Sequence, residues 1–176
     1  MLKATVEDAL NEQINAEFYS EHLYLSMAAY FEVEGLPGFA AWMRAQAAEE
    51  RAHGMRLFEF IVDRDGRVEL DGLEAPPTEW DDPADAFEAA YDHEVEISGL
   101  IDDLVALARD EHDNATETML QWFVAEQVEE EATAQEIVDR LHRVGDDGTG
   151  LLMVDQELGA RGAGEAAAGI EAPAAE

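Results

Sequence analysis

Five side chains of metal-binding types interrupt an otherwise apolar helical pattern. They are Glu17, Glu50, His53, Glu94 and Glu130. The flanking positions at three- and four-residue spacing are apolar, so the helical period places each ionisable group in the interior. A buried carboxylate without a partner is costly, and several in one layer repel each other. A pair of cations would supply the missing positive charge. The sequence therefore predicts a buried di-metal site.

The spacing of these residues suggests how two ions would be shared. Glu50 and His53 are three residues apart, so they share one helix face. They form the Glu-x-x-His element of di-iron carboxylate bundles. We expect Glu17, Glu50 and His53 to hold the first ion and Glu50 to bridge to a second. The sequence contains no cysteine, and oxygen and nitrogen ligands suit iron or manganese.

The second ion has a poorer ligand set. A symmetric site would repeat Glu-x-x-His on the fourth helix, but the sequence there reads Gln127-x-x-Glu130. Weaker binding of the second ion suits a centre that passes metal on. A single inward glutamate is more often a boundary residue whose carboxylate reaches water. Five such residues at one level of four helices favour the metal site.

Four long helices must position these residues. The pattern predicts them over residues 5–34, 38–65, 83–111 and 115–144, with a short fifth helix over 151–158 and a weak capping signal at Thr5. Each long helix carries an inward stripe with its polar break 11–15 residues from a helix end. The stripes are Leu10, Ile14, Glu17, Glu21, Tyr24, Ala28 and Phe31; Phe39, Met43, Gln46, Glu50, His53, Leu57 and Phe60; Phe87, Ala90, Glu94, Ile97, Ile101, Leu104 and Ala108; and Leu120, Phe123, Gln127, Glu130, Ala134, Ile137 and Leu141.

The connections predict the topology. Short turns join the first and second helices, and the third and fourth, into antiparallel hairpins. Residues 67–82 have no helical period and are long enough to cross a bundle of about 42 Å. The predicted fold is all-α: a four-helix bundle with one long crossover in residues 1–158. Residues 159–176 form an Ala/Gly/Glu-rich tail that we expect to be poorly ordered.

The charge balance limits the partners of this chain. Asp and Glu number 42 against 10 Lys and Arg, which gives a formal net charge of −32, and Lys3 is the only lysine. Such a surface would repel nucleic acid and anionic membranes, and it is typical of a halophile protein. The N-terminus has no signal-peptide core, and no apolar run is long enough to span a membrane. We expect a cytoplasmic protein.

Residues 1–158 resemble the bacterial-type non-haem ferritins. The resemblance rests on four segments, which are Leu10–Glu17, Ala48–His53, His93–Glu94 and Leu120–Glu131. It extends through Gly150–Leu151 and Asp155–Leu158, which look like the short fifth helix of that family. It implies a ferritin-like bundle with a short fifth helix and oxidation of Fe(II) by O₂ or peroxide. It also implies storage of ferric mineral in a hollow 24-subunit shell.

The same resemblance implies residue roles. Glu17, Glu50, His53 and Glu94 would be ligands of a ferroxidase centre, with Gln127 and Glu130 beside the second iron. A third iron position would be formed by Glu49, Glu126 and Glu129, although these three also fit a solvated acidic face. Tyr24 would donate a hydrogen bond or an electron at the centre. The resemblance implies a similar role for Trp122.

Two further expectations concern side chains outside the centre. Haem-binding relatives carry methionine at the position of Arg51, so we expect no haem. His22, His93, His112 and His142 have no obvious partners in the sequence, which favours surface or intersubunit positions. Two alternative functions stay open: peroxide removal by a di-iron protein that stores little iron, and a metal-free helical scaffold.

Overall fold

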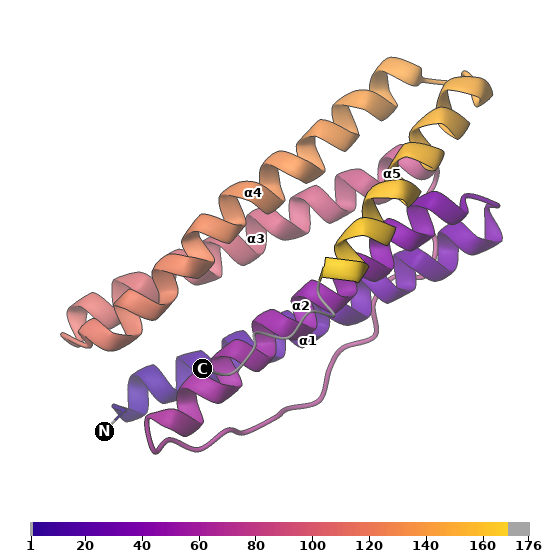
Figure 1. Ribbon diagram of the computed structural model, residues 1–176. Coiled ribbons are helices and arrows are strands. Elements are labelled where there is room, and N and C mark those ends of the chain that lie inside the picture. The colour runs from indigo at the N-terminus through magenta and orange to yellow at the C-terminus, as the bar shows by residue number, and fades with distance from the viewer. Residues whose placement is uncertain (1, 169–176) are drawn as a thin grey trace.

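The chain folds into five helices. The computed structural model describes the backbone of residues 2–168 and the side chains of residues 2–160. In chain order the helices are α1 (Ala4–Val33), α2 (Pro37–Asp63), α3 (Pro83–Asp110), α4 (Asn114–Val144) and α5 (Gly148–Ala168). Figure 1 shows α1 and α2 as one antiparallel pair and α3 and α4 as a second. No strand occurs among the described residues, which confirms the all-α prediction.

Local chemistry sets the helix ends. Asp82 caps α3 by accepting a hydrogen bond from the Asp85 amide at 2.9 Å, and Asp113 caps α4 in the same way through Thr116 at 3.2 Å. The predicted cap at Thr5 is wrong. Helix α1 begins one residue earlier, after Lys3, which makes no side-chain capping bond, and the Thr5 hydroxyl donates instead to Glu111 Oε1 at 3.2 Å.

The long connection between α2 and α3 runs beside the α1–α2 pair along the bundle (Figure 1). One side chain of α1, Asn11, holds the beginning of this connection by two hydrogen bonds. Asn11 Nδ2 donates to the Arg67 carbonyl at 3.0 Å, and Asn11 Oδ1 accepts from the Glu69 amide at 2.8 Å. Further along, the Ser26 hydroxyl donates to the Pro77 carbonyl. These anchors allow α3 to begin at the end of the bundle opposite to the end of α2, as the predicted crossover requires.

Helix α5 is longer than the sequence pattern indicates. It begins at Gly148 and continues to Ala168, past the expected end at 158. Asp155 on α5 accepts from the Phe39 amide at 2.8 Å and so caps the start of α2. Glycine is required at position 38, because a Cβ there would lie 1.8 Å from the Asp155 carbonyl oxygen. The first part of the expected tail is therefore helical, and residues 169–176 lie outside the described part.

The interior consists of two apolar clusters. One surrounds Phe31, Phe39 and Phe87, and the other surrounds Ile14, Leu57 and Phe123. The four predicted stripes are buried throughout except at Glu21 and Phe60, which are half-buried. The buried polar residues of the stripes lie between the two clusters. Within the described residues, no helix is both long and apolar enough for a membrane span.

Candidate metal centre

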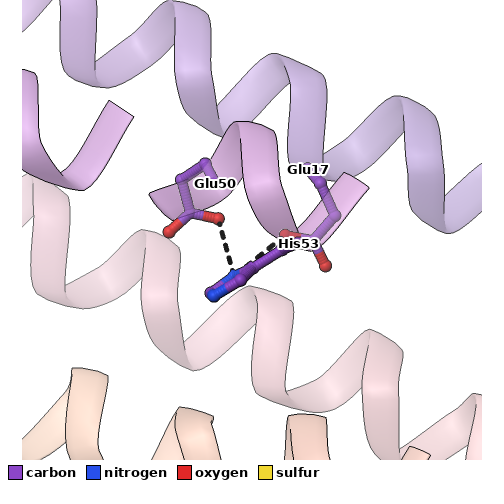
Figure 2. A group of neighbouring side chains, drawn as sticks. All are labelled: Glu17, Glu50 and His53. Carbon is purple, nitrogen blue, oxygen red and sulfur yellow. Dashed lines mark ion pairs between the residues drawn. The ribbon is translucent and has the colours of Figure 1, made fainter. Parts of the chain in front are cut away.

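Glu17, Glu50 and His53 form the first half of the predicted centre. Glu17 projects from α1, and Glu50 and His53 project from successive turns of α2 (Figure 2). His53 Nδ1 lies 3.5 Å from Glu50 Oε2 and 3.9 Å from Glu17 Oε2. Ligands about 2.1 Å from one ion would be separated by roughly 3 to 4 Å, so this spacing needs little adjustment to hold a metal. All three side chains are buried.

Two oxygen atoms of this half have no hydrogen-bond partner. They are Glu17 Oε2 and Glu50 Oε1, and within the described residues they are the only buried side-chain polar atoms without one. An unsatisfied buried polar atom costs about 1–3 kcal/mol, and more when it is charged. A cation held by Glu17 Oε2 and His53, with Glu50 Oε1 bound to it or to a second cation, would remove that cost. The donor set therefore fits a metal ion.

The second half of the centre combines Glu94 from α3 with Gln127 and Glu130 from α4. Here protein donors occupy the carboxylates. The Tyr24 hydroxyl donates to Glu94 Oε1, and Gln127 Nε2 donates to Glu94 Oε2 at 3.1 Å. Gln46 Nε2 donates to Glu130 Oε2 at 2.8 Å. The structure thus places every predicted ligand of the di-metal site in one buried layer. The first half keeps two oxygens without a hydrogen-bond partner, whereas the carboxylates of the second half have protein donors.

Burial and mutual repulsion dominate the electrostatics of this layer. Burial and the charge of Glu50 raise the pKa of Glu17 well above its usual range. Burial and the charge of Glu94 raise the pKa of Glu50 well above its usual range. The same two causes raise the pKa of Glu130 to about 8, with a contribution from Glu49. These shifts are those of carboxylates that share one low-dielectric site without a cation.

Tyr24 belongs to this layer as well. It is fully buried, and burial together with the charge of Glu94 raises the pKa of its hydroxyl well above its usual range. The phenol is therefore neutral at physiological pH and acts as a hydrogen-bond donor to Glu94.

The residues expected to form a third iron position are less closely gathered. Glu49 and Glu126 are half-buried, and their charges raise the pKa of Glu130, so both are near it. Glu129 is exposed. Among the residues whose side chains are described, the group Glu17, Glu50 and His53 is the one set of three or more candidate ligands with ligand atoms within 4.8 Å of one another. The third position stays a prediction.

Aromatic side chains enclose the first half. The rings of His53 and Trp122 are 5.3 Å apart between centroids, and Trp122 also contacts Phe123 at 4.9 Å. The Arg56 guanidinium lies over the outer face of Trp122, 4.2 Å from the ring centroid. This wall restricts the orientation of the imidazole.

Several contacts of the layer were not identified from the sequence. His93, expected at a surface without a partner, is half-buried, and its Nε2 lies 2.7 Å from the hydroxyl of the buried Ser20. The Ser98 hydroxyl donates to Glu131 and accepts a hydrogen bond from Gln127 Nε2. Gln13 donates to Glu17 Oε1 at 2.8 Å. The helical stripe includes Gln46 and would have drawn attention to it, but the reach of an amide across helices is not visible in a linear pattern.

Comparisons with known proteins relate this chain to a family. The profile of the ferritin-like domain family matches residues 7–144. A bacterial non-heme ferritin of Bacteroides fragilis is 46% identical over 161 residues, which cover 92% of this chain and all of the relative. One from Staphylococcus epidermidis is 40% identical over 92% of this chain and 97% of the relative. An open-pore ferritin structure from Archaeoglobus fulgidus is 52% identical, with a TM-score of 0.90 over 90% of this chain and 98% of that one.

Proposed function

The chain belongs to the ferritin family, and from this premise we propose that it oxidises Fe(II) at the buried centre and stores the product as ferric mineral. Membership of the family supports iron storage as its function. The finer proposal is a ferroxidase with a di-iron centre, in which Glu17, Glu50, His53, Glu94 and Glu130 bind two iron ions and Gln127 lies beside the second.

One observation carries the proposal: the buried and unpartnered Glu17 Oε2 lies beside His53 Nδ1. Glu50 presents Oε2 to the same nitrogen and keeps Oε1 buried without a partner. A site built only for packing would pair these atoms within the protein. Hard oxygen donors with one imidazole suit iron. The family assignment selects iron from among the metals that such a site would accept.

The charge of the layer supports redox chemistry with two ions. The four carboxylates of Glu17, Glu50, Glu94 and Glu130 balance two Fe(II) ions, and they stabilise the higher charge of two Fe(III) ions still more. Each Fe(II) gives one electron, so O₂ accepts two electrons and two protons and leaves as hydrogen peroxide. The carboxylates hold the ions side by side, and Tyr24 orients Glu94 through its hydroxyl.

The second half of the centre is suited to release. Its carboxylates already have protein donors, so losing a metal leaves them satisfied. We propose that iron leaves by this half towards Glu49, Glu126 and Glu129, and then enters the cavity of a 24-subunit shell. The structural neighbours are ferritins, which supports homo-oligomeric assembly. The cytoplasmic location and the adaptation to high salt stay predictions.

Fe(II) oxidation in air tests the catalytic part. The double variant Glu50→Ala, His53→Ala should lose rapid oxidation, because it removes two ligands of the first ion. A matched control replaces exposed residues of the same types, Glu59→Ala with His22→Ala, and should retain the wild-type rate. Rapid oxidation by the Glu50, His53 variant would remove these residues from the centre.

Two measurements test storage and assembly. We expect iron analysis after loading to give hundreds of ions per particle. We expect sedimentation to give a particle of about 470 kDa, since each chain has a mass of 19.4 kDa. A monomer or dimer that holds two ions per chain would contradict storage and would favour a small di-iron enzyme.

A further inference from the structure

In each half of the centre, one buried glutamine outside the predicted ligand set donates to one carboxylate. Gln13 Nε2 lies 2.8 Å from Glu17 Oε1, and Gln46 Nε2 lies 2.8 Å from Glu130 Oε2. Both glutamines are only 3% exposed. In each pair the amide occupies one carboxylate oxygen and leaves the other for a different partner.

At Gln13 the oxygen that remains is the one that faces the first metal position. Gln13 and Glu17 are one turn apart on α1, and the amide takes Oε1. The other oxygen, Oε2, is buried without a partner and lies 3.9 Å from His53 Nδ1. The hydrogen bond therefore fixes which oxygen is presented to a metal and prevents the carboxylate from rotating.

At Gln46 the amide also binds one oxygen of a carboxylate, but here the two residues are on different helices. Gln46 is one turn before Glu50 on α2, and its amide reaches Glu130 on α4. The bond ties the carboxylate of the second half to the helix that carries Glu50 and His53, and it leaves Glu130 Oε1 for a metal. An amide is suited to this role because it donates a hydrogen bond without adding charge. A carboxylate at position 46 would repel Glu130, and a lysine would neutralise it.

We propose that Gln13 and Gln46 are positioning residues, each assigned to one half of the centre: Gln13 presents Glu17 to the first metal, and Gln46 presents Glu130 to the second. This inference rests on the proposed di-iron function. Outer residues that orient metal ligands typically change affinity by about 10- to 100-fold when they are removed. The assignment predicts that each loss falls on one ion.

Calorimetric titration with Zn(II) in the absence of iron would test the assignment. Concentrated salt in the buffer would screen loose binding to the acidic surface. Gln13→Leu should weaken binding of the first zinc about 10-fold or more and leave the second within about twofold. Gln46→Leu should weaken binding of the second zinc about 10-fold or more and leave the first within about twofold. The matched control is Gln135→Leu, which removes a glutamine–aspartate bond of the same i, i+4 kind from the exposed face of α4 and should change neither affinity.

A second background separates positioning from general loosening. In Glu130→Ala, which lacks the partner of Gln46, adding Gln46→Leu should have no further effect on the zinc that remains, whereas adding Gln13→Leu should still weaken it. Gln13→Met and Gln46→Met, made in parallel, remove the same donors with a flexible side chain. They keep the test valid if a leucine variant fails to fold.

The outcomes are distinguishable. If the wild-type chain binds fewer than two zinc ions, the proposed di-metal function fails. If it binds two and the glutamine variants bind them equally well, or lose both equally, only the positioning assignment fails. Selective loss of one ion in each variant supports it.

Discussion

The two halves of the centre contain similar ligands in opposite states. In the first half, Glu17 and Glu50 each keep a buried oxygen without a partner. In the second half, Tyr24, Gln46 and Gln127 donate to the carboxylates. The first half is therefore unfavourable when empty and would be relieved by metal, whereas each carboxylate of the second half already has a protein donor. The difference indicates that affinity in such a site depends on how the empty state is stabilised as well as on the number of ligands.

The largest expected effect comes from removing the imidazole of the first half. His53→Ala should weaken the first metal by more than about 100-fold, since it removes a direct ligand whose loss exceeds that of an outer residue. Glu130→Ala should weaken only the second. Zinc titration of the two variants checks this. Equal losses in both would break the proposed division of the centre.

The second prediction makes the halves alike. The double substitution Gln127→Glu, Glu130→His places Glu-x-x-His on α4, as Glu50 and His53 do on α2. The second ion should then bind about 10-fold more tightly, because an imidazole joins the ligand set while the number of carboxylates stays the same. Iron should stay in the centre after oxidation.

Iron content after gel filtration, together with the rate of a second round of oxidation, measures that retention. Glu136→Gln on the exposed part of α4 is a control that should behave as wild type. Unchanged turnover of the double variant would contradict the idea that a weak second half promotes release.

The third prediction concerns pH. The pKa of Glu130 is raised to about 8 in the folded chain from an ordinary 4.5, so folding favours its protonated form. The stability that the fold gains from the protonated Glu130 is fully present below about pH 4.5. It is lost as pH rises through about 8. Metal-free protein should therefore lose up to about 1.4 kcal/mol of unfolding free energy per pH unit for each such group.

Denaturant unfolding between about pH 6 and pH 8, with a chelator and then with Zn(II), tests this dependence. Glu130→Gln should reduce the slope, because it removes the titrating group. Zinc should reduce it as well, because the metal binds the ionised form. A slope that is the same in all three samples would show that Glu130 titrates normally.

The last prediction concerns the Tyr24 hydroxyl. Tyr24→Phe leaves Glu94 Oε1 without its donor, which should lower stability by about 1–3 kcal/mol in the empty protein and by less when metal is bound. Thermal unfolding of both forms gives the difference. Tyr91→Phe, which removes a tyrosine hydroxyl from a half-buried position on α3, is the control. Equal losses with and without zinc would separate Tyr24 from the second half.

Much of this molecule follows from its sequence. The spacing of Glu17, Glu50, His53, Glu94 and Glu130 predicted both the bundle and the layer, because an amphipathic period fixes which residues face inward. The roles of Gln13 and His93 did not follow, since their partners depend on side-chain conformation. The extension of α5 also went unrecognised, because its glycines lower the helix propensity that its alanines provide, and because the contact of Asp155 with α2 is not visible in the sequence.

The separation of the interior into two apolar clusters has a mechanical consequence. The four long helices pass through both clusters. The polar layer between the clusters contains the two buried side-chain oxygens without a partner among the described residues, Glu17 Oε2 and Glu50 Oε1. A bound metal pair would act as a crosslink between the four helices at this layer. Backbone amides near the layer should therefore exchange with solvent faster in the empty protein and slow down on loading, so that each cycle of iron passage would alternately stiffen and relax the middle of the subunit.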